Sequence, residues 1–172
     1  MVTIRPVSSS DDASVKEMVF SILDKEFPSK EDRSYLSGDM EHVSKNYSSQ
    51  GDTFLVACSD KQIVGTIGIK KEDERNALMR RIFVMPEYRG KKIGAQLIQK
   101  AVAFCKDYGY QEIIFKTTSR MEDAIRLVQS NGFVKRATIN LGGLDLFKFT
   151  MFLEREKNNH AHISEKEKGR RA

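Results

Sequence analysis

The sequence VMPEYRGKKIGAQL spans residues 84–97 and joins an apolar, strand-like run to an amphipathic, helix-like run. The turn between them is basic and contains glycine. A helix start leaves several backbone N–H groups without intrahelical partners, and glycine lets an anion approach them without an intervening side chain. This stretch therefore predicts a cradle for a phosphorylated cofactor.

Positive charge is concentrated around this turn. Residues 80–92 contain five basic side chains and one acid, whereas the whole chain of 172 residues has a formal net charge of +5. A local positive spot suits one anionic ligand better than a nucleic-acid backbone, for which we would expect a continuous basic stripe. We therefore expect no nucleic-acid partner. A basic nucleic-acid-binding module is the weakest of three hypotheses, and salt-sensitive DNA binding would revive it.

Length and composition limit the class of protein further. With 40% apolar residues the chain is able to bury a sizeable core in one domain. No run approaches the roughly 18 apolar residues of a membrane helix, and the first residues lack a secretory pattern, so we expect a cytoplasmic protein without membrane contact. Cys58 and Cys105 are the only cysteines, without a Cys-x-x-Cys pair. We expect both in the core, no disulfide and no metal site.

Apolar periodicity and turn residues predict the order of elements along the chain. The expected strands are 2–7, 54–58, 63–69, 77–84, 113–117, one starting at Phe133, and 146–153. The expected helices are 12–27, a weaker one within 29–50, 93–108 and 124–131. The crossover from the fourth strand to the fifth through a helix places these two strands parallel, with antiparallel neighbours. We therefore predict a mixed α/β sheet with helices on both faces in residues 1–153, and a charged tail without fixed structure in residues 154–172.

Three pieces of this sequence together resemble the GNAT superfamily of acetyl-CoA-dependent N-acetyltransferases. Residues 79–84 (MRRIFV) are similar to the family's central strand, and residues 89–95 (RGKKIGA) are similar to its pyrophosphate loop. Ala124 and Leu127, followed by Gly132-Phe133, are similar to its closing helix and strand. The resemblance implies a GNAT-like fold, with a mostly antiparallel sheet that splays open at the acyl-CoA site.

The resemblance also implies a set of residues that bind acetyl-CoA or coenzyme A as co-substrate. Backbone groups of Ile82, Phe83 and Val84 would pair with the pantetheine amides. N–H groups at the helix start would bind the pyrophosphate; they belong to Arg89, Gly90, Lys91, Lys92, Ile93, Gly94 and Ala95. The cationic side chains of this loop would add charge toward the phosphates. A bulky side chain at position 94 is expected to occupy the pyrophosphate's space and abolish binding.

Two departures from the family pattern leave the catalytic acid and base unassigned. Valine at 128 stands where many relatives have a proton-donating tyrosine, and leucine at 78 stands where many have a glutamate. Ser119, Thr117 or a carboxylate within residues 24–41 is able to anchor a proton-carrying water, and the sequence does not choose among them.

The leading hypothesis is an N-acetyltransferase in which a primary amine attacks acetyl-CoA directly in a ternary complex. The acceptor would be a small molecule or a peptide, held near four acids: Asp24, Glu26, Glu31 and Asp32. A non-catalytic acyl-CoA sensor or regulatory protein is the alternative, because of Val128 and Leu78. The chain is expected to be a monomer or a homodimer.

Overall fold

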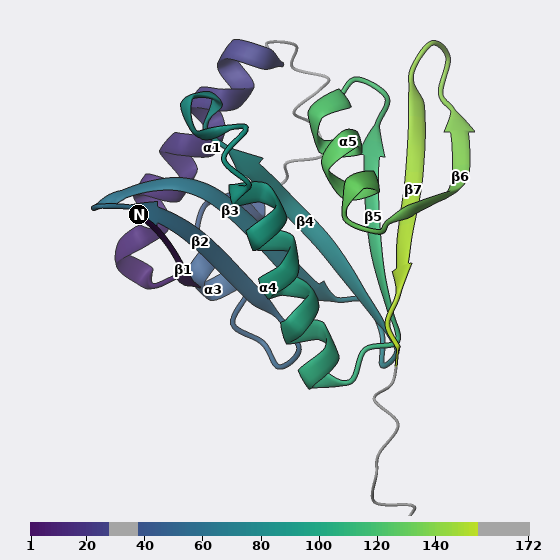
Figure 1. The fold of residues 1–172 in the computed structure, drawn as a ribbon, viewed down its shortest axis with the longest axis horizontal. Coiled ribbons are helices and arrows are strands. Elements are labelled where there is room, and N and C mark those ends of the chain that lie inside the picture. The colour runs from purple at the N-terminus through teal and green to yellow at the C-terminus, as the bar shows by residue number, and fades with distance from the viewer. Residues whose placement is uncertain (28–37, 155–172) are drawn as a thin grey trace, which may run out of the picture.

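The computed structural model describes residues 1–27 and 38–154, and its centre is one seven-stranded sheet in the order β1-β2-β3-β4-β5-β7-β6 (Figure 1). β4 and β5 are parallel, and every other neighbouring pair is antiparallel. The predicted mixed, mostly antiparallel sheet is therefore confirmed. The strands are β1 (Val2–Pro6), β2 (Thr53–Ser59), β3 (Gln62–Lys71), β4 (Asn76–Val84), β5 (Glu112–Thr118), β6 (Val134–Asn140) and β7 (Asp145–Phe152).

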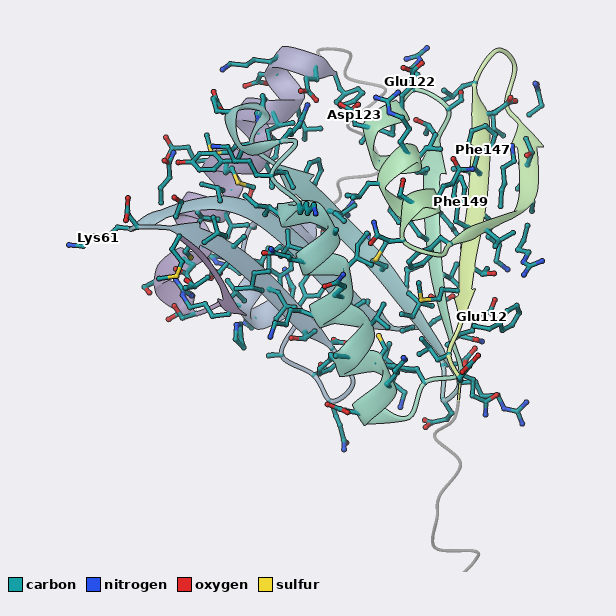
Figure 2. All side chains as sticks on the ribbon, in the orientation of Figure 1. Lys61, Glu112, Glu122, Asp123, Phe147 and Phe149 are labelled. Atoms are coloured by element: carbon teal, nitrogen blue, oxygen red, sulfur yellow. The ribbon has the colours of Figure 1, made fainter. Side chains whose placement is uncertain are left out.

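Helices cover both faces of this sheet, as predicted. They are α1 (Asp12–Glu26), α3 (Val43–Asn46), α4 (Ile93–Tyr108) and α5 (Glu122–Ser130), with 3-10 helices at Ser9–Asp11, Gly38–Met40 and Pro86–Tyr88. The apolar side chains of α1 and α3 pack on one face against β2 and β3, while those of α4 and α5 pack on the other face against β2, β3, β4, β5 and β7. Phe147 and Phe149 of β7 lie on the α5 side of the sheet (Figure 2).

Both cysteines lie in the core, as their alternation with apolar residues predicts. Cys58 is buried in the cluster beneath α1, and Cys105 is buried on the inner face of α4. Burial raises the pKa of the Cys105 thiol to about 12, because the thiolate is poorly solvated there. At neutral pH this side chain behaves as a small apolar residue.

The helix expected within residues 29–50 is wrong in its extent. Among the described residues, only the 3-10 turn Gly38–Met40 and the four-residue α3 occupy this stretch, although Met40, Val43 and Tyr47 are buried as their spacing predicts. Residues 28–37 and 155–172 lie outside the described part. Glu31 and Asp32 therefore stay predictions, as does the division into a domain of residues 1–153 and a tail. The first helix ends at Glu26, before Pro28, as expected.

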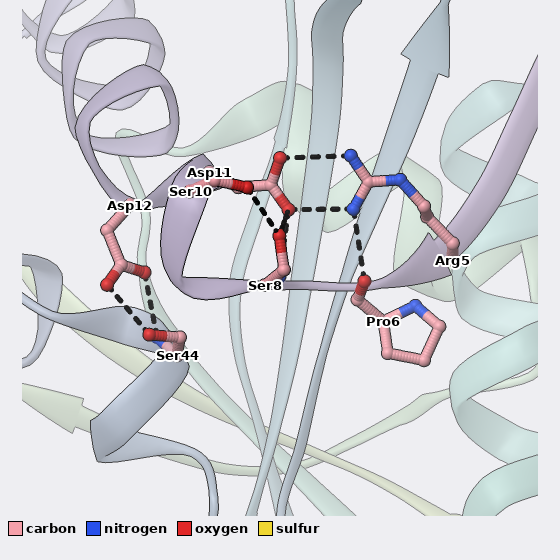
Figure 3. A network of polar contacts seen from close by, with 7 residues as sticks. All are labelled: Arg5, Pro6, Ser8, Ser10, Asp11, Asp12 and Ser44. Atoms are coloured by element: carbon pink, nitrogen blue, oxygen red, sulfur yellow. Dashed lines mark hydrogen bonds and ion pairs between the residues drawn. The ribbon is translucent and has the colours of Figure 1, made fainter.

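A polar network fastens β1 to the start of α1 (Figure 3). The Arg5 guanidinium donates to both carboxylate oxygens of Asp11, at 2.7 and 2.9 Å, and the Ser8 N–H donates to Asp11 Oδ2 at 2.8 Å. At the next position, Asp12 accepts hydrogen bonds from the N–H and hydroxyl groups of Ser44, which ties α1 to α3. The side-chain bond from Arg5 lowers the pKa of Asp11 well below its usual range, and the two Ser8 bonds assist against the opposing effect of burial.

Replacing Asp11 by asparagine is expected to lower the free energy of unfolding by about 1–2 kcal/mol at pH 7, since Arg5 is half exposed and solvent screens part of the pair. Because folding depresses the pKa of Asp11, its contribution is complete above the ordinary value of 3.8 and is lost as the pH falls below it. Urea unfolding from pH 7 to pH 2 would show the two proteins converging in acid. Asp107→Asn, at an exposed acid of α4, is the control, and a constant difference across this range would contradict the assignment.

Candidate active site

The central feature of the site is a separation of two parallel strands. β4 and β5 pair only from Asn76 with Glu112 to Met79 with Phe115, although both strands continue beyond these residues. β5 stays paired with β7 over its whole length, so β5 diverges from β4 together with the β7–β6 hairpin. The backbone of residues 80–84 consequently has no strand partner on its β5 side, as the expected splay requires.

A bulge in β4 marks the start of this separation. The register between β3 and β4 shifts between Thr66 and Gly68, and opposite this shift Arg81 adopts a left-handed backbone with φ of 56°. The buried Thr66 hydroxyl donates to the Arg81 carbonyl at 2.8 Å. The guanidinium of Arg81 is bound by both carboxylate oxygens of Asp39, with two N–O distances of 2.9 Å, and the Tyr47 hydroxyl donates to the same carboxylate at 2.8 Å. These contacts fix an uncommon backbone conformation beside the open strand edge.

The loop between β4 and α4 presents a row of unbonded backbone amides. Tyr88 and Arg89 donate their N–H groups to Met85 and Pro86, but the N–H groups from Gly90 to Ala95 find no acceptor among the residues that the structure describes. Gly90 has φ of 78°, and a Cβ there would meet nothing within 4 Å. The sixteen-residue helix α4 follows and adds the positive end of its dipole. The loop thus fits a pyrophosphate, which supplies the acceptors that these amides lack.

A cavity of about 760 Å³ connects the open edge of β4 with this amide row. All ten residues that the sequence predicts for cofactor binding lie in or beside it, and each of them except Lys91 lines it. The opposite wall comes from the end of α1 and from the start and inner face of α5; sequence reasoning named Glu26 and Leu127 but did not place them in this wall. This wall includes Ile22, Glu26, Arg120, Met121, Glu122, Asp123 and Leu127; Figure 2 labels Glu122 and Asp123 at the start of α5. The cavity is large enough for a pantetheine arm and a diphosphate.

Arg89 bridges the two walls of the cavity. Its Nη1 and Nη2 donate to the carboxylate of Glu26 at 2.6 and 3.1 Å, Nη1 also lies 3.3 Å from Asp123 Oδ2, and Nε donates to the Val84 carbonyl at 3.1 Å. The expectation that Arg89 adds free positive charge toward phosphates therefore needs correction, because two carboxylates neutralise it in this arrangement. Its bond to Val84 also engages a carbonyl that the resemblance assigns to pantetheine.

The two lysines of the loop have different environments. The Lys91 ammonium lies over the Tyr88 ring, 5.0 Å from its centroid, whereas Lys92 lines the cavity and has φ of 64°. The left-handed backbone at position 92 suits a residue without Cβ. Lys92 retains this strained conformation and adds a cation to the cradle.

Replacing Lys92 by glycine is expected to raise the free energy of unfolding by about 0.5–1 kcal/mol, because it relieves the left-handed strain. Lys91→Gly is the matched control, since φ of Lys91 is not positive and glycine there only adds backbone entropy to the unfolded chain. Urea midpoints at constant m measure both changes. Destabilisation by Lys92→Gly equal to that of Lys91→Gly would show that the strain is absent in solution.

A side chain introduced at position 94 would point in a different direction from the one expected from the sequence. A Cβ built at Gly94 would lie 2.7 Å from Cδ2 of Leu127, so it points to α5 and not into the pyrophosphate loop. Gly94 therefore leaves room for the end of the Leu127 side chain, which would have to shift if position 94 carried a Cβ. A substitution there acts on the cavity by displacing its α5 wall.

The structure places the candidate acid and base groups but selects none of them. Val128 is fully buried in the core, and Leu78 lies on the sheet face opposite α4. Ser119 is held by Asp145, because each of the two residues donates a hydrogen bond to the other through its backbone N–H. Thr117 is buried. Of the acids expected to hold an amine, Glu26 is bound to Arg89.

Neither a membrane span nor a metal cluster stands out in the part of the chain that the structure describes. None of its helices is long and apolar enough to cross a bilayer. Within the same residues, no group of three or more histidine, cysteine, aspartate or glutamate side chains is arranged to hold a metal ion.

Comparison with known proteins gives matches at the levels of family, sequence and fold. The model of the acetyltransferase (GNAT) family matches residues 16–133. Human N-acetyltransferase 8B is 34% identical over 106 residues, which cover 58% of this chain and 47% of that protein, so the chain spans about half the length of the curated relatives that it matches.

Solved structures agree with this result. A GNAT-family acetyltransferase from Staphylococcus aureus Mu50 superposes with a TM-score of 0.76 at 25% identity, over 90% of this chain and all of the other. The PaiA N-acetyltransferase from Thermoplasma acidophilum, solved in complex with coenzyme A, superposes with a TM-score of 0.72 at 22% identity, over 89% and 99% of the two chains. At that identity the second likeness concerns the fold alone.

Proposed function

The chain belongs to the GNAT family of acetyltransferases, and from this premise we propose that it transfers the acetyl group of acetyl-CoA to a primary amine in a ternary complex. The observation that carries the proposal is the row of unbonded N–H groups from Gly90 to Ala95, which lines a cavity continuous with the open edge of β4. Such a row with a strand edge beside it suits a ligand that has a pyrophosphate at one end and an amide-containing arm at the other.

Residues of β4 would hold and polarise the reactive end. The backbone of Ile82 and Phe83 borders the separation from β5, so their amide groups are available to an extended arm laid along the strand. When bound, acetyl-CoA supplies a thioester carbonyl carbon, to which the amine nitrogen bonds while the carbon–sulfur bond breaks, and the proton lost by the nitrogen ends on the thiol. The contribution of the chain is to hold both reactants in contact, which is worth about 7–11 kcal/mol of barrier.

No side chain is required to form a covalent bond in this reaction. The rigid bulge at Arg81 keeps the β4 amides in place, so that a backbone N–H is preorganised toward developing negative charge on the carbonyl oxygen. Since valine occupies position 128, proton transfer to the thiolate would use water or a group outside α5. The alternative of a non-catalytic acyl-CoA sensor uses the same cradle and predicts binding without turnover.

Two measurements test the proposal. Acetyl-CoA at about 100 times its Kd is expected to stabilise the protein by about 2.7 kcal/mol, which raises the thermal midpoint. An acetyl thioester of N-acetylcysteamine, which lacks the nucleotide, is the control and is expected to cause little shift. Release of free thiol with a panel of amines then separates an enzyme from a sensor. Absence of any shift with acetyl-CoA would refute the cradle, and a shift without thiol release from any amine would favour the sensor.

A further inference from the structure

A row of three cations crosses the sheet where β4 and β5 separate. The last pair between these strands is Met79 with Phe115, so Arg80 and Lys116 are the next residue on each strand. On the other side of β5, Lys116 is directly opposite Lys148 of β7. We refer to Arg80, Lys116 and Lys148 as the cationic row.

The cationic row lies on the sheet face opposite α4 and α5. Met79, Phe115 and Phe149 point into the core beneath α4, and side chains alternate along a strand, so each residue of the row points to the other face. The charge of Arg80 acts on both Asp39 and Tyr47, which agrees with a position on the side of α3.

Within the described residues, the charges of the row are not neutralised by ion pairs. No acid there forms an ion pair with any of the three side chains, and Lys116 is exposed. Both oxygens of Asp39 are engaged by Arg81, and Glu112 lies at the opposite end of β5 from the separation (Figure 2). A fourth cation, Arg136 of β6, lies on the same face, with Nε 3.4 Å from Thr150 Oγ1 and its guanidinium over the Phe152 ring.

Like charges directly opposite each other on neighbouring strands destabilise a sheet. Folding alone therefore does not explain why Lys116 faces Lys148, whereas an anion bound between them would stabilise the pair. We propose, on the basis of the acetyltransferase function proposed above, that the acceptor is an amine that also carries carboxylate groups. The cationic row binds these carboxylates and directs the amine through the strand separation to the thioester.

The geometry sets the size of this acceptor. Residues 82–84, which border the reactive end, lie two to four positions beyond the row, roughly 7–13 Å along the strand. The long lysine side chains of the row cover part of this distance. An acceptor whose amine is only a few bonds away from its carboxylates is able to span the rest. Acidic dipeptides and tripeptides with a free amino terminus meet this requirement. Glu26, one of the four acids expected from the sequence to bind an amine cation, is instead bound to Arg89.

The test compares isosteric peptides with different charge. Gly-Glu-Glu, Gly-Gln-Gln and Gly-Arg-Arg, each as the carboxy-terminal amide, are assayed by thiol release at low salt. We expect kcat/KM for Gly-Glu-Glu to exceed that for Gly-Gln-Gln by about tenfold. Lys116→Gln and Lys148→Gln should each raise KM for Gly-Glu-Glu by about three- to fivefold, with kcat and the Gly-Gln-Gln reaction unchanged. Lys116→Glu should shift the preference toward Gly-Arg-Arg. Lys100→Gln, at an exposed lysine of α4, is the control.

Stability measurements separate this role from a structural one. Lys148→Gln removes the opposition of two like charges, so its thermal midpoint should stay equal or rise while its KM rises. Two results would overturn the inference and leave the acetyltransferase function intact. One is acetylation of amines without a preference for Gly-Glu-Glu, and the other is a preference for Gly-Glu-Glu that is the same in Lys116→Gln as in the native protein. Absence of transfer to any amine would instead remove the function on which it rests. Lysine-dependent binding of a short DNA duplex, together with no preference among the three peptides, would assign the row to nucleic acid.

Discussion

Replacing Asp39 by alanine is expected to lower the free energy of unfolding by about 3–5 kcal/mol, the largest stability effect we predict. The Arg81 side chain is only 5% exposed, and the Asp39 carboxylate accepts two of its N–H bonds together with the Tyr47 hydroxyl. Burial opposes ionisation of Asp39, but the bonds from Arg81 and Tyr47 prevail and hold its pKa below the usual range. Removal of the carboxylate leaves a buried guanidinium without this compensation.

The same substitution is expected to weaken acetyl-CoA binding, because Arg81 forms the bulge from which the open edge of β4 begins. Equilibrium unfolding in urea gives the stability change, and calorimetric titration with coenzyme A at low temperature gives the affinity of the folded fraction. Asp39→Asn keeps one oxygen acceptor and should have an intermediate effect. The double variant Arg81→Leu with Asp39→Leu should recover much of the stability, since an apolar pair often replaces a buried ion pair at little cost. A loss below about 1 kcal/mol for Asp39→Ala would show that solvent reaches the guanidinium.

The sequence alone correctly predicted the parts of the structure that depend on residues close together in the chain. Local patterns predicted the strand that ends at Val84, the glycine-containing loop and the helix α4. The reason is that the spacing of apolar residues and the left-handed preference of glycine act over only a few residues. The parallel arrangement of β4 and β5 followed from the crossover rule. These predictions needed no knowledge of distant contacts.

Features that depend on distant pairs were not accessible in this way. Arg81 finds its carboxylate at Asp39, and Arg89 finds Glu26, so two of the five cations that gave the loop region its apparent charge are neutralised. The positive φ of Arg81 has no sequence signal, because arginine is not a residue that favours this conformation. The opposition of Lys116 and Lys148 depends on the register of two strands, which the sequence left undetermined.

Gly94→Glu is expected to reduce the affinity for acetyl-CoA by more than about 100-fold, through a contact that only the structure reveals. A Cβ at this position would meet Leu127 Cδ2 at 2.7 Å and Cδ1 at 3.1 Å, so any side chain has to enter between α4 and α5. Overpacking of this kind costs about 1–3 kcal/mol of stability. The residues of α5 form one wall of the cavity, and the amide row from Gly90 to Ala95 forms another. A displacement of α5 therefore changes the distance between these two walls. The added carboxylate also repels the diphosphate beside the helix start.

Three further variants separate these causes. Gly94→Gln has the size of glutamate without its charge, so the difference between the two affinities measures the repulsion. Gly94→Ala alone should weaken binding to a smaller extent, and Gly94→Ala combined with Leu127→Ala should restore it, because the shortened side chain at 127 vacates the space that the new Cβ requires. Calorimetric titration with coenzyme A gives the affinities, and circular dichroism with thermal unfolding verifies that each variant is folded. Binding by a folded Gly94→Glu protein within about threefold of the native affinity would mean that the diphosphate does not occupy the amide row of α4, and the proposed cofactor site would have to be abandoned.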